Sequence, residues 1–192
     1  TGQIYMTRGL IGLANDEAEL ASVLAHEMAH IIAHHAALRE NEARRVAIDA
    51  SAVLDTVNDT TGAIALAKSK LAFANFSRAQ EFEADAIGVG IAARAGYDPQ
   101  GAVRFLTSMS RFAGLRSASS SDPRSIDFMS SPPATPERIE NAVNTARQYA
   151  GGERNVAEYR EALDRLAYGE DPVEGFVRGR RFVHPKLGFA FT

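Results

Sequence analysis

Two histidines four residues apart place the strongest constraint on how this chain can fold. His26 and His30 lie within residues 20–32, where apolar residues recur with the spacing of a helix. Residues four apart lie one above the other on a helix face, so both imidazoles can reach one metal ion. Glu27 projects about 100° around the helix from His26, which puts its carboxylate beside the ion. This H-E-x-x-H pattern predicts a zinc site in the middle of a rigid helix, with Glu27 as general base.

A third metal ligand must come from elsewhere, because a catalytic zinc site has three protein ligands and one open position. The candidates are Glu81 and Glu83, on a second predicted helix. Asp85 follows Glu81 by four residues and shares its helix face, so it can accept a hydrogen bond from the outer N–H of a ligand histidine. Glu83 points to a different face, toward solvent or another helix. The spacing favours Glu81 as the ligand and Asp85 as the outer partner.

Composition and charge exclude several other kinds of protein. The chain has 192 residues, 45% of them hydrophobic, which suffices for one domain with an ordinary core. A net charge of −3 without a long basic run gives no indication of nucleic-acid binding. The absence of cysteine excludes disulfides and cysteine-ligated zinc, and no apolar run approaches the roughly 18 residues of a membrane helix. Because the chain starts at Thr1 without an initiator Met or a signal sequence, we expect a fragment or a processed form.

The pattern of apolar residues predicts a mainly α (α+β) fold. Residues 3–8 alternate in polarity and predict a half-buried N-terminal strand, whose edge could accept a substrate strand. Asp16 and Glu19 form a predicted capping box at the start of the helix that carries the histidines, which continues to about Leu38. Further helices are predicted over residues 41–57, 62–76, 77–95, 98–115, 135–149 and 155–168, the last four capped by Ser77, Asp98, Thr135 and Asn155. Residues 116–135 are predicted to form a mobile loop, and the tail 175–192 one or two strands.

Three blocks of sequence resemble one family of zinc peptidases. They are residues 9–35 around the H-E-x-x-H pattern, then Ser77-Arg78 with Glu81-Phe82-Glu83-Ala84-Asp85 and Gly88, and then Ala95-Gly96-Tyr97-Asp98-Pro99. Their order and separation are similar to those in the gluzincin family of CAAX prenyl endoproteases, HtpX heat-shock proteases and BepA-like periplasmic proteases. In that family the first Glu of the E-x-x-A-D block is the third zinc ligand, which agrees with Glu81.

The resemblance implies a zincin-type metalloprotease fold with a small N-terminal β element, an active-site helix and short C-terminal strands. Residues 1–150 would be the catalytic domain. Residues 151–192 would form a C-terminal helix and a short β tail, as the start of a truncated further segment. The lack of membrane helices and the Ala-Gly-Tyr-Asp-Pro segment resemble the soluble, BepA-like branch.

The resemblance also implies a function, that of a zinc-dependent endopeptidase in bacterial envelope protein quality control. Such a hydrolase would work in the periplasm or cell envelope on unfolded or misassembled polypeptides, and peripheral contact with a membrane stays open. The alternative is a chaperone-like binding module that keeps the fold but cleaves little. Intact Glu27 favours the peptidase, because a scaffold needs no general base.

One segment departs from the family pattern. BepA-like relatives carry His-Pro before a segment similar to residues 134–139, and that His can reach the zinc from a mobile loop. Here Pro132 stands at the position of the His, and proline cannot bind a metal. The hypothesis is a site without this His plug, whose fourth position is held by water.

Other polar residues keep alternative interpretations. Candidates to stabilise the developing oxyanion are Arg78, Arg138, Tyr97 and His184. For Arg78 a structural ion pair is at least as good an interpretation. His34 and His35 are expected to pack, or to make capping hydrogen bonds at the helix end, rather than to bind metal.

Overall fold

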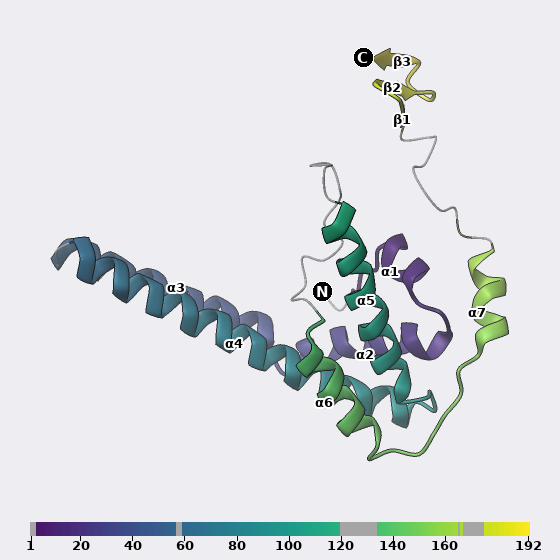
Figure 1. Ribbon diagram of the computed structural model, residues 1–192, viewed down its shortest axis with the longest axis horizontal. Coiled ribbons are helices and arrows are strands. Elements are labelled where there is room, and N and C mark those ends of the chain that lie inside the picture. Colours follow the sequence, from purple (N-terminus) through teal and green to yellow (C-terminus); the bar gives the residue numbers. More distant parts are fainter. Residues whose placement is uncertain (1–2, 57–58, 120–133, 165, 167–174) are drawn as a thin grey trace.

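The chain forms a helical body, a long helical hairpin and a small separate sheet (Figure 1). The computed structural model describes residues 3–56, 59–119, 134–164, 166 and 175–192. Within these ranges the elements are α1 (Arg8–Leu13), α2 (Glu17–Ile32), α3 (His35–Thr56), α4 (Asp59–Arg94), α5 (Gln100–Ser119), α6 (Pro136–Ala146), α7 (Val156–Leu163), β1 (Phe176–Arg178), β2 (Arg181–His184) and β3 (Phe189–Phe191). A mainly helical fold with short C-terminal strands is thereby confirmed.

The helical body is built around α2, which packs against α4 and α5, while α6 packs against both of these. Its core gathers apolar side chains from α5, α6 and α7, among them Phe105, Leu106, Met109, Ala142 and Tyr159. At the crossing of α2 and α4, a Cβ on Gly88 would lie 3.0 Å from the backbone nitrogen of His26. Glycine therefore lets α4 approach α2 at the residue that opens the H-E-x-x-H pattern.

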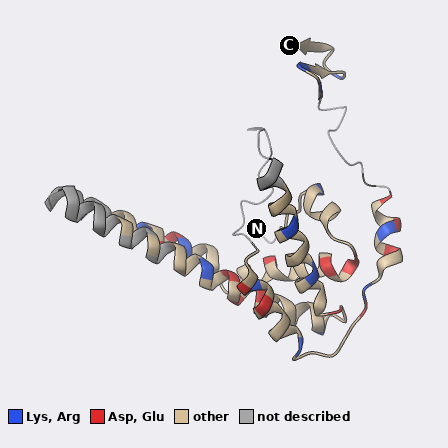
Figure 2. Cartoon of the chain, viewed as in Figure 1, with Lys and Arg blue, Asp and Glu red and all other residues tan. Residues whose placement is uncertain are grey.

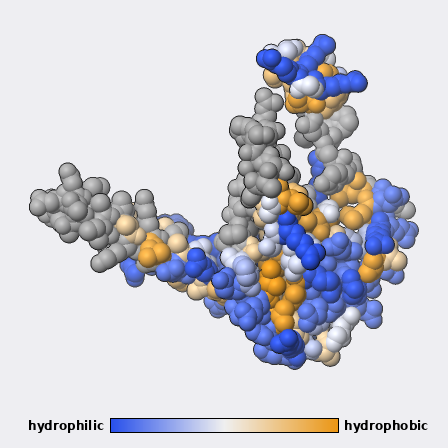
Figure 3. Space-filling model, viewed as in Figure 1, coloured by the Kyte–Doolittle hydropathy of each residue, from blue (hydrophilic) through white to orange (hydrophobic). Residues whose placement is uncertain are grey.

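The helices α3 and α4 form an antiparallel hairpin that projects from the body (Figure 1). The 36 residues of α4 correspond to about 54 Å at the usual rise of a helix. Residues of both charge signs follow one another along α3 (Figure 2). Among them, Arg44 pairs with Glu40 and Arg45 with Glu42. The drawn face of the body mixes small hydrophobic areas with wider hydrophilic ones (Figure 3). Among the described residues, no helix combines the length and the apolar character needed to cross a membrane.

The predicted N-terminal strand is wrong. Residues 3–7 have no regular secondary structure, and Arg8 already belongs to α1. Thr7 begins that helix, because its hydroxyl accepts a hydrogen bond from the backbone N–H of Leu10. A strand also needs a neighbour for its backbone groups, and the only sheet in the described ranges lies at the other end of the chain. Tyr5 is 83% exposed, so the alternation of polar and apolar residues in this segment does not correspond to a buried strand face.

Two predicted helix boundaries also differ. The helix that carries the histidines ends at Ile32, and the chain turns at His34, whose φ of 54° is left-handed, before α3 starts. Conversely, the two helices predicted on either side of Ser77 are one helix, α4, so Ser77 is not an N-cap. A capping sequence acts only where a helix starts, and packing of α4 against α3 and α2 continues the helix through this point.

Local capping signals predicted most of the other helix starts correctly. Asp16 accepts from the backbone N–H of Glu19 at 2.9 Å, and Thr135 accepts from that of Arg138. Asp98 accepts from the backbone N–H of Gln100 before α5. Asn155 is the exception, because its backbone is left-handed and its side chain makes no cap. Its amide donates instead to Glu17 Oε2 at 2.6 Å, which fastens the start of α7 to α2.

The C-terminal tail forms three antiparallel strands in the order β1-β2-β3, one more than the upper limit predicted. Phe182 of β2 lies opposite Phe191 of β3, with ring centroids 5.1 Å apart. Much of the loop predicted over residues 116–135, including Pro132 and the hypothesis that rests on it, lies outside the described residues. The domain boundary at residue 150 stays a prediction.

Candidate metal centre

Three side chains from two helices converge on one point. His26 and His30 come from α2 and Glu81 from α4, and one ligand atom of each lies within 4.8 Å of the others. The His26 and His30 Nε2 atoms are 3.0 Å apart, His26 Nε2 is 3.4 Å from Glu81 Oε2, and His30 Nε2 is 3.5 Å from Glu81 Oε1. A tetrahedral zinc ion with bonds of about 2.0–2.1 Å separates its ligand atoms by about 3.3 Å. The site therefore has the dimensions of a metal centre.

One oxygen of Glu81 gives a direct test of whether a cation fits. Glu81 is 1% exposed, and its Oε1 accepts a hydrogen bond from Arg39 Nη2 at 2.7 Å. Its Oε2 is buried and makes no hydrogen bond of good geometry, with only longer contacts of 3.4 Å to His26 Nε2 and 3.5 Å to Arg138 Nη1. Burial raises the pKa of Glu81, but its polar contacts with His26 and His30 and the charge of Arg138 lower it by more, so the carboxylate is ionised. A buried carboxylate whose two oxygens face two imidazoles, one of them without a hydrogen bond of good geometry, is the setting a metal cation would satisfy.

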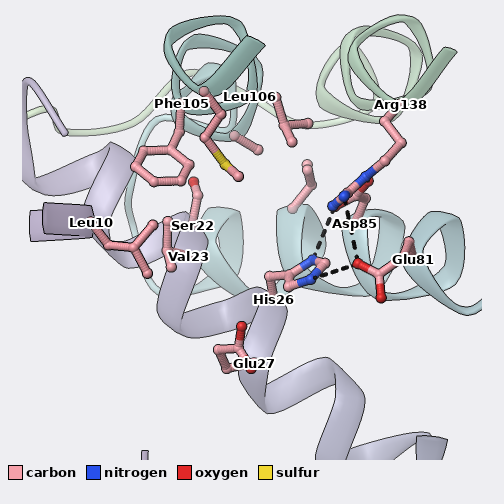
Figure 4. Close-up of a pocket in the computed structure, with 13 residues that line it drawn as sticks. Leu10, Ser22, Val23, His26, Glu27, Glu81, Asp85, Phe105, Leu106 and Arg138 are labelled. Carbon is pink, nitrogen blue, oxygen red and sulfur yellow. Dashed lines mark hydrogen bonds and ion pairs between the residues drawn. The ribbon is translucent and has the colours of Figure 1, made fainter. Parts of the chain in front are cut away.

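Asp85 and Arg138 support the site from behind (Figure 4). Asp85 Oδ1 lies 2.9 Å from His26 Nδ1, so the carboxylate accepts from the outer N–H and leaves Nε2 free for a metal. Arg138 of α6 is buried and donates from Nε and Nη2 to the two oxygens of Asp85, at 2.7 and 2.8 Å. Burial raises the pKa of Asp85, and the bonds from Arg138 and His26 bring it below its usual value. Arg138 is thus a supporting residue, tied to Asp85.

Glu27 follows His26 on α2 and is half-buried (Figure 4). It lines a cavity of about 70 Å³ whose far end is apolar, with Leu10, Val23, Val89, Phe105, Leu106 and Met109. It also lines a wider groove on the other side with His30 and Ile31. Glu27 therefore borders both the candidate ligands and open space that a substrate could enter.

The other residues singled out from the sequence lie elsewhere. Arg78 is exposed, near the exposed Glu137. The Tyr97 hydroxyl donates to Glu17 Oε1 at 3.2 Å, at the far end of α2. His184 belongs to β2, where its Nδ1 accepts from the backbone N–H of Leu187. None of these three lines either cavity beside Glu27.

The contacts of two further residues at the site were not predicted from the sequence. Arg39 binds both Glu81 and, through Nε at 2.6 Å, Gln80 Oε1. His35 is 1% exposed, and its Nδ1 lies 2.7 Å from His30 Nδ1. Both belong to α3, whose first residues, to about Leu38, were predicted to continue the helix that carries the histidines. A spacing of four residues between His35 and Arg39 was the available signal, because it puts them on one helix face.

Comparisons with known proteins identify the family. A family model described as Peptidase family M48 matches residues 1–146. The beta-barrel assembly-enhancing protease of Escherichia coli is 28% identical over 157 residues, which cover 77% of this chain and 31% of that protein. The protease of the same name from Yersinia pestis is 32% identical over 115 residues, or 55% of this chain and 24% of that protein.

A mitochondrial relative extends the similarity. Mitochondrial metalloendopeptidase OMA1 of Saccharomyces cerevisiae is 32% identical over 143 residues, which cover 73% of this chain and 40% of that protein. The chain spans less than half the length of each of these relatives. No solved structure matches it. All three candidate ligands and Glu27 fall inside the residues that the family model matches, and the chain belongs to peptidase family M48.

Proposed function

We propose that this chain carries the catalytic site of a zinc-dependent endopeptidase. His26, His30 and Glu81 would hold the zinc, and Glu27 would be the general base. The observation that carries the proposal is the convergence of the buried Glu81 carboxylate on the two Nε2 atoms, at 3.4 and 3.5 Å, with no hydrogen bond of good geometry to its Oε2. Two imidazoles and one carboxylate are a donor set of catalytic zinc sites, in which the fourth position is left for water and substrate.

Glu27 supplies the proton transfers of the proposed reaction. Zinc, when bound, would polarise the scissile carbonyl and lower the pKa of water toward about 7. Glu27 takes a proton from the attacking water while the water oxygen bonds to the carbonyl carbon. Glu27 then gives that proton to the departing amine nitrogen. The C–N bond breaks, leaving a carboxylic acid and an amine. Asp85 meanwhile holds His26 in the orientation that directs Nε2 to the site.

The biological setting is proposed from the relatives. Two of them are named beta-barrel assembly-enhancing proteases and one a mitochondrial metalloendopeptidase. We infer that the substrates are polypeptides, that these are unfolded or misassembled proteins, and that the protein works in the periplasm or envelope of a bacterium. These relatives are longer than this chain, so its substrates and location are proposed only from the part of each relative that it matches.

The proposal is tested by cleavage of fluorescently labelled casein by the full chain. We expect wild type to cleave, and Glu27→Gln to lose at least about a hundredfold in rate, as for removal of a general base. A chelator should abolish cleavage by wild type, and added zinc should restore it. The matched control is Glu140→Gln, an exposed glutamate of α6 that lines neither cavity, which should retain activity.

The alternative is a chaperone-like module that binds polypeptides without cutting them. Equal cleavage by wild type and Glu27→Gln, or no cleavage by zinc-loaded wild type, would contradict the peptidase. If the same wild-type protein then prevents aggregation of an unfolded outer-membrane protein, the binding module is the better account.

A further inference from the structure

The outer nitrogen of His30 has a partner outside the H-E-x-x-H and E-x-x-A-D patterns. His30 Nδ1 lies 2.7 Å from His35 Nδ1, and the two rings meet edge to face with centroids 4.9 Å apart. The ring of His35 continues to Glu83, whose Oε2 lies 3.3 Å from His35 Nε2. His35 thus bridges a candidate metal ligand and a carboxylate.

The position of His35 is built into the chain. The left-handed turn at His34 ends α2 and lets α3 start with His35 pointing back at His30. Gln80 of α4 donates to the backbone carbonyl of His35 at 3.5 Å, and the His35 side chain is 1% exposed. A buried imidazole with both nitrogens in polar contact is more than a helix cap, because each contact fixes where a proton must be.

When His30 binds a metal, only one placement of the protons on the His30 and His35 rings satisfies both contacts. A metal needs the lone pair of His30 Nε2, so the proton of that ring must sit on Nδ1. His30 Nδ1–H then donates, and His35 Nδ1 must accept. The proton of a neutral His35 therefore sits on Nε2, from which it can donate to Glu83 Oε2. Every donor along this path meets an acceptor.

We propose that His35, backed by Glu83, is the positioning residue that fixes the tautomer and orientation of His30 for metal binding. The inference rests on the metal site of the proposed function. It gives His30 what Asp85 gives His26, with a neutral imidazole in place of a carboxylate at the first contact. Glu83 thereby acquires a role behind the site, although its side chain is 58% exposed and it is not a ligand.

The first test measures zinc affinity by competition with a chromophoric chelator, on the full chain. His35→Ala should weaken binding about 10–100-fold, the usual effect of losing such a partner. His35→Asn should recover most of the affinity, because its Oδ1 can accept in the place of Nδ1. Glu83→Ala should weaken binding several-fold. The matched control is His34→Asn, the exposed neighbour, which keeps a residue type suited to the left-handed backbone and should bind like wild type.

The second test observes the protons directly and needs no variant. In zinc-loaded wild type, ¹⁵N NMR of the imidazoles should find His30 protonated on Nδ1 and His35 protonated on Nε2. A purely structural role for His35 would not require this pair of tautomers. Circular dichroism and the melting temperature of the metal-free variants separate loss of metal binding from loss of folding, and the exposed Glu83→Ala serves where His35→Ala does not fold.

The outcomes separate this inference from the proposed function. If wild type binds zinc and His35→Ala binds it within about threefold, or if His35 carries its proton on Nδ1, the positioning role is overturned while the zinc site stands. If wild type takes up no zinc, the metal site falls and this inference falls with it. Loss in His35→Ala together with recovery in His35→Asn supports it.

Discussion

His26 carries the most consequential proton of the metal centre. Burial lowers the pKa of His26, but the hydrogen bond to Asp85, the polar contact with Glu81 and the charge of Asp85 raise it to about 9. Without a metal the ring is therefore an imidazolium at neutral pH, and it can donate from Nδ1 to Asp85 and from Nε2 to His30. A metal that binds at Nε2 must displace this second proton.

Zinc binding should accordingly release protons. At pH 7.5 we expect about one proton per zinc, measured by calorimetry in buffers of different ionisation enthalpy. Affinity should rise about tenfold per pH unit from pH 7 to pH 9 and then level off. In Asp85→Asn the pKa of His26 should fall, and so should the number of protons released. Binding of zinc to wild type without proton release would contradict the raised pKa of His26.

The proton on His26 Nε2 opposes metal binding, but it stabilises the folded state of the metal-free protein. A pKa raised on folding stabilises the folded state fully below the unfolded value of about 6.5, and this stabilisation is lost as pH rises through the folded value. Metal-free wild type should therefore lose stability to urea between pH 6.5 and pH 9. His26→Gln, which cannot titrate, should show a flatter profile over this range.

At the scale of elements, the start of α2 is a charged cluster that anchors the ligand helix. Asp16 is fully buried, accepts from the backbone N–H of Glu19, and pairs with Arg104 at 3.1 Å and Arg154 at 2.8 Å. Burial raises the pKa of Asp16, but the bonds from Glu19 and Arg154 and the charge of Arg104 leave it below its usual value. The cluster joins α2 to α5 and to the segment before α7.

Asp16→Asn should lower the free energy of unfolding at pH 7 by about 1–2 kcal/mol, because Arg154 loses its counter-charge and Arg104 keeps only those of Glu19 and Asp98, while the cap is kept. Since the pKa of Asp16 is lowered on folding, its contribution is present above the unfolded value of about 3.9 and is lost as pH falls through the folded value. The gap between wild type and variant in urea unfolding should therefore narrow below about pH 4. The exposed Asp164→Asn should change stability by less than about 0.5 kcal/mol, and an equal loss there would argue against the cluster.

The crossing of α2 and α4 should tolerate no side chain at Gly88. Its Cβ would meet backbone atoms of His26 and Ala25 at 3.0–3.2 Å, so Gly88→Ala should push the helices apart, cost about 2 kcal/mol in thermal or urea unfolding, and weaken zinc binding. The control is Gly114→Ala in α5, where a Cβ meets nothing within 4 Å and should stabilise by about 0.5–1 kcal/mol. A neutral Gly88→Ala would show that the crossing can relax.

Sequence reasoning succeeded where the determinant is local. The caps at Asp16, Asp98 and Thr135, and the shared face of Glu81 and Asp85, depend on residues within one helical turn. It failed where a distant partner decides. The strand predicted at residues 3–8 would have needed a neighbouring strand. Ser77 has a capping sequence but lies inside α4, which packs against α3. Arg39 could not be assigned to Glu81 because the turn at His34, on which that contact depends, has no glycine to mark it.

At the scale of the whole molecule, the metal centre and the C-terminal sheet are separate parts. The strands β1, β2 and β3 pair with one another and stand away from the helical body (Figure 1). The segment before them is different, because α7 packs on the body. Tyr159 is buried and its hydroxyl donates to the Ile11 carbonyl at 2.6 Å, and Arg154 reaches Asp16. The family match ends at residue 146, ahead of these contacts.

Two truncations follow from this division. A chain of residues 1–164 should melt within about 3 °C of the full chain and bind zinc equally well. A chain of residues 1–150 should lose roughly 3 kcal/mol or more, because Tyr159 leaves the core and Asp16 loses Arg154. Circular dichroism melts of both chains check this. Equal stability of the two would place α7 outside the folding unit, in agreement with the boundary predicted at residue 150.

The most direct test of the central claim is the zinc content of purified protein after dialysis, measured by elemental analysis. Wild type and Glu27→Gln should each hold about one zinc per chain, because Glu27 lies beside the ion and does not bind it. Glu81→Gln should hold far less, since it replaces the charged third ligand while keeping its shape. A full zinc complement in Glu81→Gln, or none in wild type, would contradict the assignment of His26, His30 and Glu81 as the metal centre.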